Sequence, residues 1–542
     1  MNRTAQSTGG HHAGCPEDHY PNNNPVTFLI AFLTALVVFL AYLPVLKYGF
    51  TNWDDPDYTL ENLHIRSMDF GFFKWVFTSA SVSNWHPLTI ISYALDYRIW
   101  GLNPTGYHLT SIVFHALNTA LVFLLSVRLA GFLPEGCGNG LKKFILPLVA
   151  ALLFGLHPLH VESVAWVAER KDVLCGFFYM LSVLFYLEYS SSRKTSAYIA
   201  AFILFVLALM SKPMAISLPF ALLLLDFYPL GRLQKEARTA ALEKIPFFMF
   251  SGVSAYLTIW AQKADGAIMT IAAYPLHFRI DTVVRACVFY LYKMILPINL
   301  APFYPLTLRP DYFNRVFYIY AAVFMAITAF CVLAAKRRRV FLTAWLFYLV
   351  TLGPVSGLVQ VGGQAAADRY TYLPLLGPFF LAGLGAQVLF NRLNRKVLKD
   401  IATGIITAAL VVLTVLTVKQ AAVWKDSLTL WSHEIRLYPG RAPRAHLNRG
   451  LAYQDRGDLQ KAIEDYTFAI RLDPDNAEAY NNRGVVHRLR GNYGLAVRDI
   501  LIAISINPQL ATAYYNLGVA YQEVGETEYA LKALEKAKEL GY

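Results

Sequence analysis

The C-terminal part of this 542-residue chain repeats with a period of 34 residues, while most of the sequence before it is apolar. Residues of one type recur at this spacing: Gly450, Gly484 and Gly518; Ala462, Ala496 and Ala530; Ala469, Ala503 and Ala537; Pro474 and Pro508. A fixed period of this size is typical of solenoids, because each unit is one small element that stacks on the next. The pattern predicts a short helical solenoid attached to a membrane-embedded region.

These landmarks resemble the tetratricopeptide repeat (TPR), a helix–turn–helix unit in which small residues let paired helices approach and a proline ends the second helix. Three TPR units are expected over residues 443–542, after a connecting helix over residues 421–442. A TPR array is a surface that binds proteins or peptides. Any chemistry is therefore expected in the membrane region, residues 26–420.

The composition indicates a polytopic helical membrane protein, since 56% of the residues are hydrophobic and only 15% are charged. The net charge of +12 does not indicate nucleic-acid binding, because residues 441–542 hold 13 basic and 13 acidic residues and are neutral. The excess of basic residues lies in short runs between apolar segments, as the positive-inside rule expects. No nucleic-acid partner is expected.

The first 25 residues are expected to be a disordered cytoplasmic tail. They hold His11, His12, Cys15 and His19 without a fixed ligand spacing, which favours a polar tail over a metal site. The apolar run after the tail has no cleavage site of a signal peptide. The five cysteines are scattered and predict neither a disulfide framework nor a zinc site.

Eleven membrane spans are expected, at residues 28–46, 107–130, 144–158, 173–189, 196–210, 213–229, 245–262, 316–335, 340–360, 371–390 and 401–418. Another apolar stretch, 282–298, has Lys293 in its middle and Pro297 near its end, which suits a re-entrant or interfacial helix. If that stretch does not cross, the N-terminus and five basic clusters lie in the cytoplasm, and the repeats lie outside. The clusters are Lys142 and Lys143; Arg193 and Lys194; Arg232, Lys235, Arg238 and Lys244; Lys336, Arg337, Arg338 and Arg339; and Arg392, Arg395, Lys396 and Lys399. The membrane is then the bacterial inner membrane with a periplasmic array, or the ER membrane with a lumenal one.

Two adjacent carboxylates, Asp54 and Asp55, follow the first span on the outside face. One of them could act as a general base toward an acceptor. The alternative is a turn or helix cap, for which the sequence Asp-Asp-Pro is ordinary. Later in the same loop, His86 could hydrogen-bond a phosphate or an acid, or could be a structural histidine at the membrane surface.

The second outside loop contains His157, His160 and Glu162, which together suggest a metal-ligand set. The motif lacks the i, i+4 pairing of a zincin, and Pro158 breaks the helix such a pairing needs, so a metal site is not favoured. Arg170 and Lys171 follow, and these side chains are suited to hold a phosphate.

Lys212, Lys293 and Arg369 are further cations at membrane depth on the outside face, where the charge bias disfavours them. An anionic lipid headgroup would require such cations. In the competing structural interpretation, Arg369 pairs with Asp368, and Arg170 pairs with Glu169 or Asp172.

Taken together, these residues resemble the GT-C class of polyprenyl-phosphate-sugar glycosyltransferases, most closely the transmembrane-and-TPR O-mannosyltransferase (TMTC) family and its bacterial relatives. The resemblance covers nearly the whole chain beyond the tail. Its carrying segments are Trp53-Asp54-Asp55-Pro56, His86-Pro87-Leu88, Gly106-Tyr107-His108, His115 through Asn118, His157 through Glu162 with Arg170, Lys212-Pro213, and Asp368 through Pro374.

The resemblance implies an all-α fold with a GT-C-like membrane domain and a TPR solenoid. It implies that Asp54 or Asp55 is the catalytic base, that the donor is a lipid-linked monosaccharide such as a mannose, and that transfer inverts the anomeric carbon. The expected substrate-binding residues are His86, Glu162, Arg170, Lys171, Lys212, Lys293 and Arg369. The array would present a protein or peptide acceptor. No cofactor is obligatory, because a lipid phosphate is already a good leaving group that cations need only neutralise; a divalent cation is the alternative.

Two other functions stay open from the sequence. A non-catalytic TPR scaffold for envelope assembly would explain the repeats but not the paired acids. A flippase or ligase for a surface glycan would share the outside-face cations and the many spans.

Overall fold

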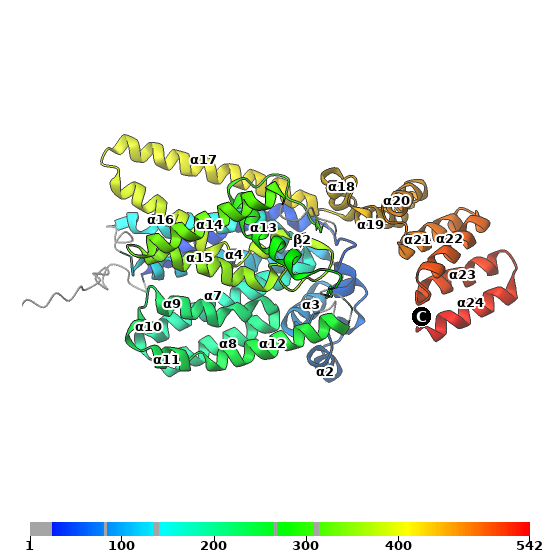
Figure 1. Ribbon diagram of the computed structural model, residues 1–542, viewed down its shortest axis with the longest axis horizontal. Helices are drawn as coiled ribbons and strands as arrows, with labels where there is room; N and C mark the ends of the chain where they lie inside the picture. Colours follow the sequence, from blue (N-terminus) through cyan, green and yellow to red (C-terminus); the bar gives the residue numbers. More distant parts are fainter. Residues whose placement is uncertain are drawn as a thin grey trace, which may run out of the picture. The chain divides into compact units, whose positions relative to one another are not determined.

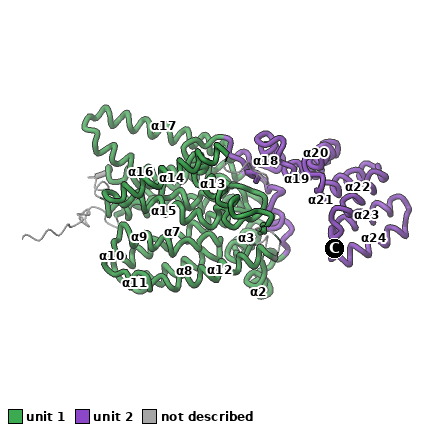
Figure 2. The backbone as a smooth tube through the Cα atoms, viewed as in Figure 1, with its two compact units in different colours: residues 1–46, 64–298, 307–421 green, residues 47–63, 299–306, 422–542 purple. Residues whose placement is uncertain are grey.

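The computed structural model describes residues 24–80, 84–133, 140–264, 266, 268–270, 272–306 and 314–542, and these are overwhelmingly helical (Figure 1). Almost all of the predicted tail lies outside the described residues. The chain divides into two compact units (Figure 2). Unit 1 comprises residues 1–46, 64–298 and 307–421, and unit 2 comprises residues 47–63, 299–306 and 422–542.

Unit 1 contains the membrane helices. Its helices are α1 (Pro25–Tyr42), α2 (Phe70–Thr78), α3 (Pro87–Trp100), α4 (Pro104–Ala130), α5 (Ile145–Leu156), α6 (Val161–Ala165), α7 (Arg170–Ser192), α8 (Thr195–Ser211), α9 (Leu218–Phe227), α10 (Arg232–Lys235), α11 (Ala237–Leu242), α12 (Ile245–Ala264), α13 (Leu276–Ile295), α14 (Arg315–Ala335), α15 (Arg339–Leu352), α16 (Leu376–Arg392) and α17 (Lys396–Ala421), with the short strand β2 (Gln364–Ala366). Local signals start several of these helices. Asn24 caps α1 and Asn103 caps α4, each with a proline in the first turn.

A helix lies within each of the eleven predicted spans, but fewer are long and apolar enough to cross a membrane unaided. Among the described residues, five helices meet that standard, at 25–47, 104–130, 167–192, 315–335 and 396–424. A sixth span would join residues 142–156 to 158–165, which are bent by 51° at His157. Pro158 ends the predicted span 144–158 and Pro213 begins the predicted span 213–229, and each proline starts a 3₁₀ turn in place of a regular α-helix.

Helix α13 begins and ends at one end of unit 1. Near its start, Arg279 Nη1 donates a 2.9 Å hydrogen bond to the carbonyl of Leu358, beyond the C-terminus of α15. Near its end, the carbonyl of Met294 lies 2.9 Å from Nε2 of His157, beyond the C-terminus of α5. The ends of α13 therefore contact segments that follow the C-termini of α15 and α5, and a re-entrant or interfacial form of residues 282–298 stays a prediction.

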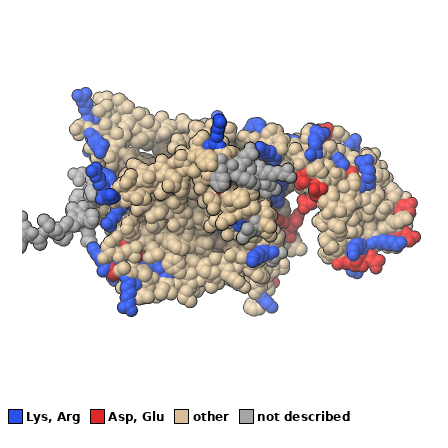
Figure 3. Space-filling view, viewed as in Figure 1, with Lys and Arg blue, Asp and Glu red and all other residues tan. Residues whose placement is uncertain are grey.

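Basic side chains gather at the other end of unit 1. Figure 3 shows Lys and Arg over the ends of α9–α11 and over the turn between α16 and α17, on the left in this view. The predicted basic clusters at Arg193–Lys194 and Lys336–Arg339 lie in the matching turns, α7–α8 and α14–α15. Figure 3 also shows Lys and Arg at other places on unit 1, so the charge is not confined to one end, but basic residues in turns between helices are what the positive-inside rule expects of a cytoplasmic face.

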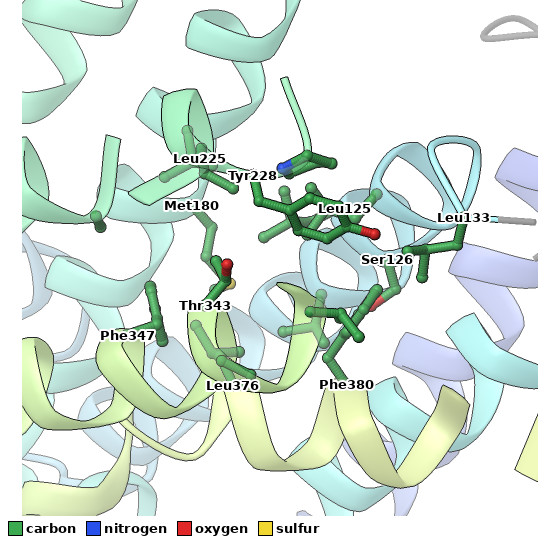
Figure 4. Close-up of a pocket in the computed structure, with 18 of the residues that line it drawn as sticks. Leu125, Ser126, Leu133, Met180, Leu225, Tyr228, Thr343, Phe347, Leu376 and Phe380 are labelled. Atoms are coloured by element: carbon green, nitrogen blue, oxygen red, sulfur yellow. The ribbon is translucent and has the colours of Figure 1, made fainter. Parts of the chain in front are cut away.

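An apolar cavity of about 110 Å³ lies between α4, α7, α9, α15 and α16 (Figure 4). Leu125, Met180, Leu225, Phe347 and Phe380 are among the residues that line it. The charged residues predicted for a substrate site are not among its lining, so this cavity is not that site.

Unit 2 is built from paired helices. They are α18 (Ser427–Leu437), α19 (Pro443–Asp455), α20 (Leu459–Leu472), α21 (Ala477–Leu489), α22 (Tyr493–Ile506), α23 (Ala511–Glu523) and α24 (Thr527–Glu539). The turns within the pairs contain Gly457, Gly491 and Gly525, all with positive φ. A Cβ atom at Gly450 would lie 2.6 Å from the ring of Tyr466, so the small residue permits the close approach of α19 and α20. The strand β1 (Tyr304–Pro305) also belongs to unit 2.

Candidate functional site

The two predicted catalytic acids, Asp54 and Asp55, belong to unit 2, in the segment 47–63. They differ in environment. Asp55 is buried, and its Oδ2 accepts hydrogen bonds from the backbone N–H of Thr51 at 2.8 Å and from the Thr51 hydroxyl at 3.0 Å. Asp54 is partly exposed. Asp55 therefore closes a turn with Thr51, and Asp54 is the more exposed of the two acids.

In unit 1, three of the predicted cations converge on one carboxylate that is absent from the predicted site. Lys171 Nζ lies 3.1 Å from Oε1 of Glu169, Lys212 Nζ lies 3.1 Å from Oε2, and Arg369 Nε lies 3.1 Å from Oε1. Glu169 is only 3% exposed at its side chain, whereas the three cations keep 9–11%. The chain thus forms a cradle of positive charge around an oxyanion, with its cationic side chains still reaching the surface.

Two more acids complete this group. Arg369 Nη1 pairs with Glu162 Oε1, and its backbone N–H donates a 2.9 Å hydrogen bond to Glu162 Oε2. Lys212 also lies 2.6 Å from Oδ1 of Asp172. We call these six residues the Glu169 cluster: Glu162, Glu169, Lys171, Asp172, Lys212 and Arg369. Its formal charges balance, three positive against three negative.

Arg369 does not pair with Asp368, the partner that the structural interpretation of the sequence expects. Glu162 and Glu169 hold it, rather than Asp368, and Gln364 Oε1 accepts a 3.2 Å hydrogen bond from Nη2. The guanidinium also lies over the ring of Trp166, 5.5 Å from its centroid. These contacts orient the planar fork of the arginine.

His86 is a neighbour of the Glu169 cluster and is buried. Burial, and then the charge of Lys171, lower its pKa to about 3. The imidazole is therefore neutral at physiological pH and can both donate and accept a hydrogen bond.

Lys293 stands near the loop that carries Arg369. Its Nζ donates a 2.6 Å hydrogen bond to the carbonyl of Ile298, which closes the turn after α13. Burial lowers the pKa of Lys293, and the charge of Asp368 opposes that effect. The structure thus gives Lys293 a local structural role beside its predicted one.

Arg170 is placed differently from the other predicted cations. Its side chain is fully buried, its Nη2 lies 2.5 Å from Oδ2 of Asp96, and it donates a 2.8 Å hydrogen bond to the carbonyl of Tyr107. The guanidinium also stacks on Tyr93, 4.6 Å from the ring centroid. Its ion-pair partner is Asp96 rather than Glu169 or Asp172, and these contacts favour a structural role over phosphate binding.

The two histidines of the suggested metal set point to other partners. His157 Nε2 lies 2.9 Å from the Met294 carbonyl, His160 Nδ1 lies 2.8 Å from the Phe154 carbonyl, and Glu162 pairs with Arg369. Within the described residues, no group of three or more His, Cys, Asp or Glu side chains is arranged to hold a metal ion.

A second buried charge group lies at the opposite end of α7. Both Oδ atoms of Asp226 accept hydrogen bonds from the Tyr186 hydroxyl at 2.8 Å, Arg232 lies 3.4 Å from Oδ1, and Lys244 pairs with Oδ2. We call Tyr186, Asp226, Arg232 and Lys244 the Asp226 cluster. Both Asp226 and Lys244 have side chains that are 0% exposed.

Sequence reasoning missed Glu169, Asp172 and Asp96 as site or supporting residues. In the sequence, Glu169 and Asp172 stand out only as acids that flank Arg170. Asp96 lies within the apolar helix α3, and an acid in such a helix is costly unless it is paired, which is the signal that could have drawn attention to it.

The comparisons confirm the predicted repeats and the resemblance. A family model described as TPR repeat matches residues 450–491, and one described as tetratricopeptide repeat matches residues 511–540. Among solved structures, a crystal structure of MamA is 27% identical with a TM-score of 0.20, over 22% of this chain and 67% of that one. ArnT from Cupriavidus metallidurans bound to undecaprenyl phosphate is 15% identical with a TM-score of 0.39, over 90% of this chain and 81% of that one.

Three curated relatives share one description. Protein O-mannosyl-transferase TMTC4 of Homo sapiens is 25% identical over 72% of this chain, and protein O-mannosyl-transferase F38B6.6 of Caenorhabditis elegans is 23% identical over 76%. Protein O-mannosyl-transferase TMTC2 of Mus musculus is 37% identical over 22% of this chain and 13% of its own length. The chain spans 58% of the human TMTC4 protein and 57% of the worm protein. Over most of its length, therefore, this chain is similar to proteins named protein O-mannosyl-transferases.

Proposed function

We propose that this chain is a membrane glycosyltransferase. It transfers a mannose-like monosaccharide from a polyprenyl-phosphate sugar to a hydroxyl acceptor, a Ser or Thr of a protein, on the extracytoplasmic face and with inversion. The observation that carries the proposal is the convergence of Lys171, Lys212 and Arg369 on the Glu169 carboxylate. The similarity to protein O-mannosyl-transferases gives that geometry its chemical class.

The Glu169 cluster is suited to hold the donor phosphate. A phosphate oxygen carries the kind of charge that Glu169 already presents to the three cations, and Arg369 offers a fork that a phosphate can accept in two places. The neutral His86 can hydrogen-bond the same group. Glu169, Glu162 and Asp172 keep the cations in place when no donor is bound.

The reaction needs one base and one leaving group. As the acceptor oxygen bonds to the anomeric carbon, its proton passes to a carboxylate, and the bond from that carbon to the phosphate oxygen breaks. The departing lipid phosphate gains negative charge, which cations of the chain neutralise. Asp54 is the proposed base, because Asp55 already accepts two hydrogen bonds from Thr51.

The extracytoplasmic face is proposed because the Glu169 cluster lies at the end of α7 opposite the Arg193–Lys194 turn, on the side away from the basic end. The TPR array would bind the polypeptide that carries the acceptor.

The direct test measures sugar transfer by the purified full-length chain from a panel of polyprenyl-phosphate sugars to a Ser/Thr peptide. Turnover with one sugar is expected. Asp54→Asn should lower the rate by about a hundred- to ten-thousand-fold, while Asp55→Asn should chiefly lower stability. Full activity of the double variant would remove both acids from the reaction, and a wild-type chain that binds donor without turnover would favour the scaffold.

A further inference from the structure

The segment that carries Asp54 is fastened to the helices that open the repeat array. The backbone N–H of Asn52 donates a 2.9 Å hydrogen bond to the Ser427 hydroxyl at the start of α18. The Asn52 side chain donates a 2.7 Å bond to the carbonyl of Asn448 in α19 and accepts a 2.7 Å bond from the indole N–H of Trp431. One asparagine thus contacts both α18 and α19, and α19 is the first helix of the first repeat.

Aromatic packing adjoins these hydrogen bonds. The ring of Trp53 stacks on that of Trp424 at 6.5 Å between centroids, with 3° between the planes, and meets Trp431 at 5.2 Å. Trp424 and Trp431 are each 1% exposed. The three hydrogen bonds of Asn52 are partly buried beside these rings, and breaking them costs free energy wherever the freed groups do not regain a partner in water.

Asn52 and the proposed base, Asp54, lie in the same closed turn. The bond from the Thr51 N–H to the Asp55 carboxylate brackets Asn52, Trp53 and Asp54. Asn52 and Asp54 therefore lie in one hydrogen-bonded turn.

We infer that Asn52, Trp53, Ser427 and Trp431 form a latch by which the start of the TPR array positions Asp54. The latch residues are positioning residues: they act on the reaction through the carboxylate of Asp54. The inference rests on the proposed function in assigning Asp54 as the base. The array then has two tasks, since it binds the acceptor polypeptide and also holds the group that activates the acceptor hydroxyl.

The experiment compares full-length chains with single and paired changes. Trp431→Phe removes the indole N–H while keeping a ring against Trp53, and Asn52→Ala removes the side-chain bonds. Each should lower kcat by about five- to tenfold and leave the KM for the lipid donor unchanged. The double variant should be little worse than either single one, because both changes break the same contact.

Tyr466→Phe is the matched control. It removes one 2.9 Å hydrogen bond, from the Tyr466 hydroxyl to Gln454, inside the first repeat and away from the latch. Its kcat should equal that of the wild type. Latch variants with unchanged kcat and lowered thermal stability would show a structural contact alone and overturn the inference.

A second measurement does not depend on turnover. Amide hydrogen exchange should be slow at Gly49, Thr51 and Asn52, whose N–H groups bond to Lys425, Asp55 and Ser427. Trp431→Phe and Asn52→Ala should speed exchange at these amides about tenfold, and Tyr466→Phe should not. Unchanged exchange in the latch variants would overturn the latch itself, whereas an inactive wild type with the expected exchange would overturn only the proposed function.

Discussion

The Glu169 cluster and the Asp226 cluster are both buried networks of acids and cations at the two ends of α7, yet they differ in what their charges can still do. In the Asp226 cluster the acid and Lys244 are wholly enclosed. In the Glu169 cluster the three cations keep about a tenth of each side chain accessible. A buried ion-pair network alone is therefore weak evidence for a binding site. Cationic side chains that stay partly exposed are better evidence that the network can bind an anion.

The largest expected effect tests the enclosed cluster. Asp226→Ala removes the carboxylate that pairs with the fully buried Lys244 and leaves Glu243, 3.5 Å from Lys244 Nζ, as its remaining acidic partner, so we expect a loss of about 3 kcal/mol in the free energy of unfolding. Donor affinity of the folded protein should not change. Denaturant unfolding and a donor-binding titration on the same sample provide both values, and a large fall in donor affinity would show that the two clusters are not separate in function.

The next effect tests the open cluster. Arg369→Lys keeps the charge but removes the planar fork, and Arg369→Ala removes both, so donor affinity should fall about tenfold and about a hundredfold, respectively. Acceptor affinity should be little altered. A donor-binding isotherm with the lipid-phosphate sugar measures the change, and unaltered affinity in the Ala variant would exclude Arg369 from the donor site.

Arg170→Lys should give the opposite result to Arg369→Lys: stability should fall while donor affinity is kept. Arg170→Lys disturbs the pair with Asp96 and the bond to the Tyr107 carbonyl, so we expect a loss of about 1–2 kcal/mol in stability. Donor affinity should stay at the wild-type value. Thermal unfolding alongside donor binding checks this, and a donor defect as large as that of Arg369→Lys would return Arg170 to the site.

The smallest effect concerns His86, which faces Lys171, Glu169 and Lys212. Its pKa of about 3 in the folded chain lies below the ordinary value for histidine, so the unfolded chain binds the proton more tightly. The stability due to neutral His86 is complete above about pH 6.5 and is lost as the pH falls toward 3. Between pH 7 and pH 5.5 the wild type should lose about 1 kcal/mol more than His86→Asn, measured by unfolding at each pH. Parallel curves for the two proteins would contradict a buried neutral histidine.

The sequence was most informative where one local period repeats. The 34-residue spacing predicted the paired helices, and the apolar runs predicted the positions of the membrane helices. Ion-pair partners could not be read in the same way. Arg369 meets Glu162 from 207 residues away, and a local pattern favours Asp368 next to it. The pairing depends on how α6, α7 and the loop before α16 pack, which no spacing rule supplies.

The candidate site was predicted in part for the same reason. His86, Glu162, Lys171, Lys212 and Arg369 were chosen singly as unusual charges or motifs, and the fold does bring them together. Glu169, which joins three of them, looked like an ordinary flanking acid. Asp54 and Asp55 look equivalent in sequence, and in the structure they differ in burial and in the hydrogen bonds that Asp55 accepts from Thr51. Their roles in catalysis stay predictions.

The latch also imposes an order on the making of the protein. Asn52 is bound by residues that lie 375, 379 and 396 positions later in the chain. At a synthesis rate of about 5–20 residues per second, the ribosome reaches those residues about 20 to 80 s after Asn52. During that interval most of the membrane helices are synthesised, while the residues that bind Asn52 do not yet exist. On this inference, a nascent chain would acquire a positioned Asp54 only after the start of the repeat array is made.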